Sequence, residues 1–166
     1  MDIKIERSNH LKKKPSGEPL GFGQYFTDHM FTMDYTEGIG WHDAKIIPYG
    51  PIELDPACMV FHYAQETFEG LKAYKLQDGQ IALFRPELNA HRLNQSNARL
   101  CMPEVPEDLF IKAIETLVKY EQDWIPDEFE HSLYIRPFMF ATEAGVGVHP
   151  SKQYNLYFYY HFITSW

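Results

Sequence analysis

An arginine stands in the middle of an apolar segment, Leu133-Tyr134-Ile135-Arg136-Pro137-Phe138-Met139-Phe140. A guanidinium in such a segment is costly to bury unless an anion pairs with it. An Asp or Glu of the same protein would meet this need. So would the carboxylate or phosphate of a bound molecule, which the planar fork of arginine grips with two hydrogen bonds. The sequence therefore marks Arg136 as part of an internal ion pair or as an anion-binding residue.

Two further segments carry polar groups next to apolar ones. Arg92 follows His91 in a segment that Pro86 opens, and on pattern alone it is typical of an exposed helix arginine. Phe68-Glu69-Gly70 precedes a strand-like run, where Gly70 indicates a bulge or a point at which another group approaches the backbone. The aromatic residues of these segments are equally compatible with a hydrophobic core.

Motifs for several other chemistries are missing from the sequence. It has no Gly-x-Gly-x-x-Gly, no Walker phosphate loop and no Gly-x-Ser-x-Gly elbow. None of the eight histidines has the His-x-x-x-His or His-Glu spacing of a zinc site. His42-Asp43 and His149 are typical of surface or hydrogen-bonding histidines. We therefore predict no metal site.

The first half of the chain predicts strands that position these residues. Gly21–Thr36 alternates loosely between apolar and polar residues, which favours one or two strands, and Trp41–Tyr49 favours another. Thr67–Leu76 and Gln80–Arg85 flank Gln77-Asp78-Gly79. An Asp-Gly between two strand-like runs is a strong hairpin signal.

The second half predicts two helices followed by two strands. Pro86 opens a helix to about Leu100, because proline fits the first helical turn. A second helix is expected from Pro106 to about Trp124, with apolar residues at three- and four-residue steps. Branched and aromatic residues then favour strands at Ser132–Ala141 and Tyr154–Ile163. This order predicts an α+β fold with two helices and a mostly antiparallel sheet.

Length and composition indicate one globular unit. The chain has 166 residues, 45% of them hydrophobic and 16% aromatic, which suits a single packed core. We expect a flexible arm at residues 1–20 and a domain at residues 21–166. The net charge of −8 argues against nucleic-acid binding. Two cysteines, the lack of an apolar leader and the short apolar runs predict a reduced, cytoplasmic protein that does not cross a membrane.

Seven segments together resemble the branched-chain amino-acid aminotransferase family. Each motif is modest, but their order and spacing over more than 130 residues are highly specific. The resemblance implies the N-terminal small domain of the class IV pyridoxal-phosphate enzymes. The matching segments are Phe22–Met30, Phe61-His62-Tyr63, Thr67–Tyr74, Leu83–Pro86, Asn89–Leu93, Ser96–Pro103 and Leu133–Pro137.

The resemblance assigns roles to individual residues. Arg92 matches the arginine that binds the phosphate of pyridoxal 5'-phosphate. Tyr134 and Arg136 match residues near the substrate carboxylate. The remaining matches form the walls of an apolar side-chain pocket and a loop that reaches the neighbouring subunit of a homodimer: Phe22, Tyr63 and Phe68 for the walls, and Val146 and Val148 for the loop.

The implied reaction moves an amino group between leucine, isoleucine or valine and 2-oxoglutarate, with a lysine that forms a Schiff base with the cofactor. That lysine is expected beyond Trp166, so no catalytic residue is assigned within this chain, and we expect the chain to be inactive alone. Residues 159–166 do not resemble the family at this point. Alternatives are a D-amino-acid aminotransferase or aminodeoxychorismate lyase of the same fold, and a non-catalytic domain that associates with intact subunits.

Overall fold

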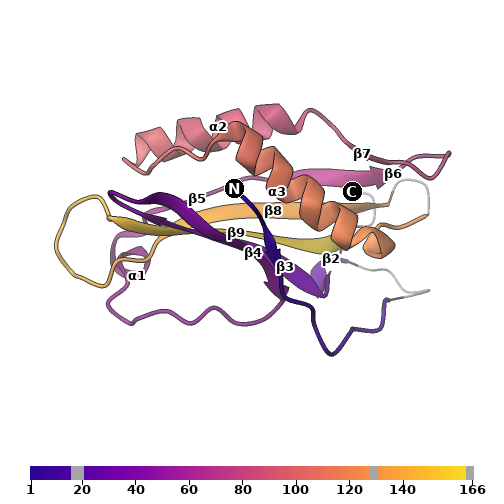
Figure 1. The fold of residues 1–166 in the computed structure, drawn as a ribbon, viewed down its shortest axis with the longest axis horizontal. Coiled ribbons are helices and arrows are strands. Elements are labelled where there is room, and N and C mark those ends of the chain that lie inside the picture. Colours follow the sequence, from indigo (N-terminus) through magenta and orange to yellow (C-terminus); the bar gives the residue numbers. More distant parts are fainter. Residues whose placement is uncertain (16–20, 128–130, 164–166) are drawn as a thin grey trace.

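The structure, a computed structural model, describes residues 1–15, 21–127 and 131–163 (Figure 1). The described residues form one mixed sheet, three α-helices and a single 3₁₀ turn. In chain order these are β1 (Lys4–Ile5), β2 (Phe22–Phe26), β3 (His29–Thr36), β4 (Gly40–Pro48), α1 (Met59–Tyr63), β5 (Glu66–Phe68), β6 (Leu71–Lys75), β7 (Ile81–Leu83), α2 (Pro86–Arg99), α3 (Glu107–Tyr120), the 3₁₀ turn Gln122–Trp124, β8 (Ser132–Ala141) and β9 (Gln153–Ile163).

The strands follow the order β1-β4-β3-β9-β8-β6-β7, with β2 also paired to β9 and β5 also paired to β8. Every pairing between the described strands is antiparallel except that of β1 with β4. This confirms the predicted α+β fold with a mostly antiparallel sheet. The expected Asp-Gly hairpin is the β6–β7 pair, in which Lys75 lies opposite Ile81.

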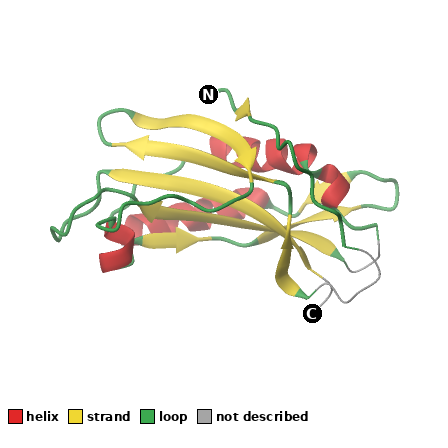
Figure 2. Ribbon diagram, turned by 90° about the horizontal axis from the view of Figure 1, so that it is seen from below, coloured by secondary structure: helices red, strands yellow, loops and turns green. Residues whose placement is uncertain are grey.

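The two long helices cover one face of the sheet and leave the other face largely uncovered. Helices α2 and α3 lie together on one side of the strands (Figure 1), and Figure 2 shows the sheet from the opposite side. Side chains of β8 and β9 alternate between these faces. Leu133, Ile135 and Phe158 are fully buried in the core. Tyr134 and Arg136 are less buried and point to the other face.

The two predicted helices are present, but the second is shorter than expected. The buried side chains of α3, which include Phe110, Ile114 and Leu117, lie at helical spacing and form its core face. The α-helix ends at Tyr120 instead of Trp124, because the chain tightens into the 3₁₀ turn. The Trp124 indole is buried there and donates a hydrogen bond to Asp28.

The expected strand Thr67–Leu76 is interrupted at Glu69-Gly70. The register does not shift across the interruption, since Phe68 lies opposite Phe138 and Leu71 lies opposite Ile135. The Glu69 amide donates to the Pro137 carbonyl over 2.8 Å. Proline has no N–H to return the second bond of this pair. The interruption therefore reflects one missing ladder bond. Helix α1, which has five residues, was not predicted.

The N-terminal residues contact the domain although most of their side chains are exposed. Strand β1 pairs with β4, and the Ser8 amide donates to His29 Nε2 over 2.8 Å. The Lys12 amide donates to Asp28 Oδ1 over 2.7 Å. Residues 16–20 of the expected arm lie outside the described residues, and the boundary at residue 21 stays a prediction.

Candidate active site

Arg136 contacts two aromatic rings on the face of the sheet opposite α2 and α3. Its guanidinium carbon lies 4.6 Å from the centroid of the Phe68 ring and 5.1 Å from that of the Tyr134 ring. Such cation–π contacts contribute roughly 0.5–2 kcal/mol each. Within the described residues no carboxylate forms an ion pair with Arg136. The sequence left two partners open for this arginine, an internal carboxylate or the anion of a bound molecule. The first is not found among the described residues.

The aromatic surroundings of Arg136 extend across the sheet to Phe22. The Phe22 ring meets the Tyr134 ring edge to face at 5.5 Å. Phe22, Phe68, Tyr134 and Arg136, four of the residues expected at the site, thus form one cluster drawn from β2, β5 and β8. We call this the aromatic cluster.

His161 belongs to the aromatic cluster and was missed by the sequence analysis. It lies opposite Tyr134 in the β8–β9 register, and the two rings stack at 4.8 Å. Its ring also meets Phe22 at 4.7 Å. Burial lowers the pKa of His161, and the positive charge of Arg136 lowers it further. His161 comes next to Tyr134 through the pairing register of β8 and β9. A local sequence pattern does not reveal that register.

Gly70 allows Tyr134 to reach the backbone of the neighbouring strand. A Cβ atom placed on residue 70 would lie 2.9 Å from Tyr134 Cζ and closer still to the hydroxyl oxygen. Of the two explanations that the sequence offered for this glycine, close approach of another group is the one observed. Burial raises the pKa of the Tyr134 hydroxyl, and Arg136 opposes that shift.

Arg92 is paired with a buried carboxylate. Its Nε donates to Glu69 Oε1 over 2.7 Å, and its Nη2 donates to Glu69 Oε2 over 2.8 Å. The Glu69 side chain is 2% exposed, whereas that of Arg92 is 65% exposed. Burial alone would raise the pKa of Glu69, but the hydrogen bonds from Arg92 and Asn89 and the charge of Arg92 hold it below its usual value. The sequence indicated Arg92 but not this partner.

The outer side of Arg92 opens to a hollow on the surface of α2. Arg92 lines a cavity of about 550 Å³ together with Gln95, Ser96, Ala98 and Arg99. Glu69 is followed directly by Gly70, which contacts Tyr134. Arg92 and the aromatic cluster are therefore linked through two consecutive residues of one strand segment.

Tyr63, Val146 and Val148 form a separate group near the other end of β8. The Tyr63 hydroxyl donates a hydrogen bond to the Val146 carbonyl. Helix α1 is attached there by the bond from the Met59 amide to the Glu143 carbonyl, 2.9 Å long. Val146 and Val148 are 67% and 88% exposed. The structure thus places Tyr63, at the end of α1, against the loop that carries Val146 and Val148, apart from the aromatic cluster.

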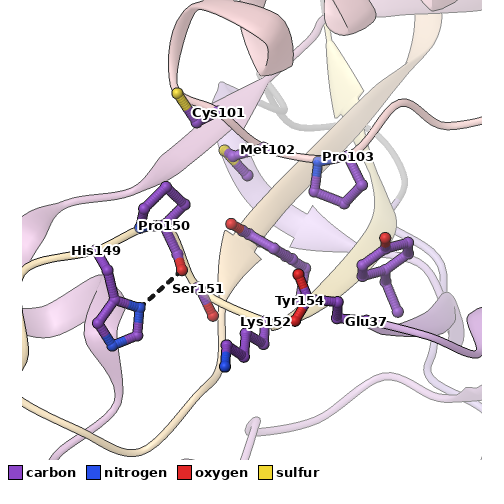
Figure 3. A pocket seen from close by; sticks show the side chains of 10 residues that line it. Glu37, Cys101, Met102, Pro103, His149, Pro150, Ser151, Lys152 and Tyr154 are labelled. Atoms are coloured by element: carbon purple, nitrogen blue, oxygen red, sulfur yellow. Dashed lines mark hydrogen bonds between the residues drawn. The ribbon is translucent and has the colours of Figure 1, made fainter.

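Another cavity, of about 610 Å³, lies between the loop before β9 and the segment after α2 (Figure 3). Cys101, Met102 and Pro103 line one side, and His149, Pro150 and Lys152 line the other. His149 Nδ1 bonds to the Pro150 carbonyl at 2.9 Å. This cavity contains none of the expected site residues, so its size does not make it the candidate site.

Asp34, His42 and Asp43 bring potential metal ligands within 4.8 Å of one another. Both ring nitrogens of His42 are already engaged, Nδ1 with Asp43 at 2.8 Å and Nε2 with Thr36 Oγ1 at 3.0 Å. This pattern is that of a hydrogen-bonding surface histidine. Among the helices of the described residues, none is long and apolar enough to cross a membrane.

Sequence comparison finds relatives that share about half of their aligned residues with this chain, although no family model matches it. "Branched-chain-amino-acid transaminase 1" of Bacillus subtilis (strain 168) is 54% identical over 153 residues, which are 92% of this chain and 43% of the relative. "Probable branched-chain-amino-acid aminotransferase" of Staphylococcus aureus (strain N315) is 56% identical over 154 residues, which are 93% of this chain and 43% of the relative. The chain thus spans less than half the length of these relatives and matches their N-terminal portion.

Structure comparison finds the same fold. The Escherichia coli branched-chain amino acid aminotransferase matches with a TM-score of 0.59 at 19% identity, over 79% of this chain and 40% of that one. The enzyme from Thermobaculum terrenum, solved in its PLP form, matches with a TM-score of 0.57 at 21% identity, over 83% of this chain and 41% of that one. At these identities the likeness shows the fold alone.

Proposed function

Because this chain is homologous to the N-terminal portion of branched-chain-amino-acid aminotransferases, we propose that it forms one side of an active site that moves an amino group between leucine, isoleucine or valine and 2-oxoglutarate. The observation that carries this proposal is the position of Arg136. Its guanidinium lies between the rings of Phe68 and Tyr134 and has no carboxylate partner among the described residues.

Arg136 is the residue that orients the substrate carboxylate. A guanidinium offers parallel N–H donors that match the two oxygens of a carboxylate. The rings of Phe68 and Tyr134 fix its plane without taking up its charge, so the cation remains available to an anion. Tyr134 contributes a hydroxyl that, like that of any ordinary tyrosine, is protonated at neutral pH and can donate a hydrogen bond.

The aromatic residues beside Arg136 form the apolar wall that receives the substrate side chain. Phe22 and Phe68 are 50% and 66% exposed and lie against Tyr134 and Arg136. Burying a branched aliphatic side chain against such rings contributes about 0.8 kcal/mol per CH₂ group. This supports selection of leucine, isoleucine and valine. Tyr63 and the Val146–Val148 loop would supply further apolar contacts, with the loop reaching the neighbouring subunit of a homodimer.

Arg92 fits the phosphate of pyridoxal 5'-phosphate. Arginine has five N–H donors, and the bonds to Glu69 take one on Nε and one on Nη2. Three donors remain to meet phosphate oxygens at the exposed end. When bound, the cofactor supplies an electron-withdrawing ring that stabilises negative charge at the α-carbon of the substrate.

No lysine of this chain is assigned as the one that forms the Schiff base with the cofactor. Lys72 lies opposite Tyr134 in the β6–β8 register and so shares a face with the aromatic cluster. Lys75 forms an ion pair with Asp127 at 2.5 Å. Reduction with borohydride in the presence of pyridoxal phosphate, followed by peptide mapping, checks this. One stoichiometric adduct on a single lysine would mean that this chain carries the Schiff-base lysine itself, which contradicts the proposal.

Cytoplasmic action is part of the same proposal. Cys58 and Cys101 are both free thiols, Cys58 buried and Cys101 exposed. A reducing compartment such as the cytoplasm keeps an exposed thiol in its reduced form.

The activity is tested in a hybrid in which this chain replaces the 153 residues that it matches in the Bacillus subtilis relative. We expect leucine-dependent conversion of 2-oxoglutarate to glutamate. Arg136→Met should lower kcat/KM for leucine roughly a hundredfold, since it removes charge-assisted bonds to the carboxylate. Arg136→Lys should recover part of the loss, because the charge remains but the fork does not.

The matched control is Lys119→Ala, which changes an exposed cation of α3 outside the site. The substrate panel should include D-amino acids. Turnover of D-amino acids in preference to leucine would replace the proposed reaction by that of a D-amino-acid aminotransferase. Full activity in the Arg136→Met hybrid would remove Arg136 from the site.

A further inference from the structure

Glu69 is a buried carboxylate that holds an exposed arginine. Its side chain is 2% exposed and lies between strand β5 and helix α2. Among the described residues, its carboxylate has polar contacts with two side chains of α2 and with the backbone of the next residue. Arg92 supplies two hydrogen bonds from α2, Asn89 Nδ2 supplies one at 2.9 Å, and the Gly70 amide lies 3.3 Å from Oε2.

The donors around Glu69 are themselves fixed in position. Asn89 also donates to the Gly70 carbonyl over 3.2 Å, so its amide bridges the helix and the strand segment. The Glu69 backbone amide is bonded to Pro137 of the central strand β8. Gly70 in turn lies against Tyr134. The carboxylate is thus anchored to the sheet, while the arginine that it grips extends from a helix toward solvent.

We propose that Glu69 is a positioning residue for phosphate binding: by holding the inner edge of the Arg92 guanidinium, it directs the three remaining N–H donors into the hollow beside α2. This inference rests on the proposed function, in which Arg92 receives the cofactor phosphate. The hollow is lined by Gln95, Ser96 and Arg99 in addition to Arg92. These side chains supply polar donors on the same surface.

Glu69 has two opposing effects on the binding of a phosphate by Arg92. Its negative charge reduces the attraction of Arg92 for phosphate, whereas its two hydrogen bonds remove the rotamer freedom of a long side chain. The three free donors lie at the exposed end of Arg92, where solvent weakens the repulsion between Glu69 and a bound phosphate. Fixing a flexible side chain in advance lowers the entropy cost of binding by about 0.5–1.5 kcal/mol, which corresponds to about a two- to twelvefold gain in affinity. We expect positioning to outweigh charge.

The experiment uses the chain labelled with ¹⁵N and titrated with pyridoxine 5'-phosphate, which carries the phosphate but no aldehyde and so cannot react with lysines. Unphosphorylated pyridoxine is the reference ligand. Two signals are followed: the dissociation constant, and the Arg92 Nε–H resonance without ligand. The variants are Glu69→Gln, Glu69→Asp and Arg92→Met. Glu87→Gln, at an exposed position in the first turn of α2, is the charge control.

We expect the chain to prefer pyridoxine 5'-phosphate over pyridoxine and Arg92→Met to abolish that preference. Glu69→Gln and Glu69→Asp should both weaken binding of the phosphorylated ligand, by about three- to tenfold, and both should lose the slowly exchanging Nε–H signal. Glu87→Gln should change neither. Glu69→Asp keeps the charge but shortens the reach, so it separates position from charge even if Glu69→Gln fails to fold.

Two results are decisive against the proposal. If the chain prefers the phosphorylated ligand through Arg92 but both Glu69 variants bind it as tightly or more tightly, Glu69 does not position Arg92 and the proposed function is unaffected. If the chain itself shows no preference for the phosphorylated ligand, the assignment of Arg92 to the cofactor phosphate fails, and the role of Glu69 fails with it.

Discussion

The ring of Tyr134 lies against the backbone of Gly70, on the neighbouring strand segment, with no room for a side chain between them. Tyr134 also makes a cation–π contact with Arg136, two residues along β8, and Gly70 directly follows the Glu69 that holds Arg92. One glycine therefore joins the two parts of the candidate site. Its importance can be measured directly.

Gly70→Ala should destabilise the chain by about 1–3 kcal/mol, because the added methyl group overlaps Tyr134 and forces the ring or the backbone to move. Urea unfolding measures the change in the free energy of unfolding. Gly50→Ala is the matched control, since a Cβ atom there meets nothing within 4 Å. Adding Tyr134→Phe to the Gly70→Ala variant should recover part of the loss. Equal stability of the Gly70→Ala and Gly50→Ala variants would contradict the contact.

The stability provided by Glu69 should depend on pH. Its pKa in the folded chain lies below the ordinary glutamate value of 4.5. A group with a depressed folded pKa stabilises the fold above the unfolded value, and this stabilisation is lost as pH falls through the folded value. The difference in unfolding free energy between the unaltered chain and Glu69→Gln should therefore be largest near pH 7 and shrink below 4.5. If the difference in unfolding free energy grew as the pH fell, the pKa of Glu69 would be raised in the folded chain and the prediction would be wrong.

The buried Asp28 should stabilise the attachment of the N-terminal residues. Its Oδ1 accepts from the Lys12 amide over 2.7 Å, and its Oδ2 accepts from the Trp124 indole over 2.9 Å. Asp28→Asn replaces one acceptor with a donor, so one of these bonds must be lost, at a cost of about 1–3 kcal/mol. Hydrogen exchange at the Lys12 amide should become faster. Asp108→Asn, at an exposed site in the first turn of α3, should leave that amide unchanged.

The packing of α3 against the sheet should depend on Leu117, which is fully buried. Leu117→Ala should lower the free energy of unfolding by about 2–5 kcal/mol, because it leaves a cavity under the helix. Lys119→Ala, two residues further and exposed, should change it by less than about 0.5 kcal/mol. Thermal unfolding followed by circular dichroism separates these outcomes. A small loss for Leu117→Ala would mean that α3 does not cover this face.

Local sequence signals were sufficient for most of the elements. The bounds of β8 match the predicted Ser132–Ala141, and α2 begins at Pro86 as its missing N–H allows. Helix α1 was missed because five residues carry too little periodicity to be read. The split between β5 and β6 was missed because its cause, the absent N–H of Pro137, lies on a different strand.

The site was only partly predictable, for a similar reason. Residues two apart on a strand share a face, which places Tyr134 and Arg136 together from sequence alone. His161 comes next to Tyr134 only through the register of β9, and Glu69 meets Arg92 only through the packing of α2 over β5. Both partners are set by contacts between distant segments, so a local pattern does not reveal them.

The strand order also determines when the sheet can be completed during synthesis. Strand β9 is the last of the described strands to leave the ribosome, yet it lies between β3 and β8 and pairs with β2 as well. Until residues 153–163 emerge, the nascent chain can form the β3–β4 and β6–β7 hairpins, but the inner edges of β3 and β8 remain unpaired. Unpaired edges of this kind attract other chains. The nascent chain therefore exposes these two edges to other chains in the interval before β9 appears.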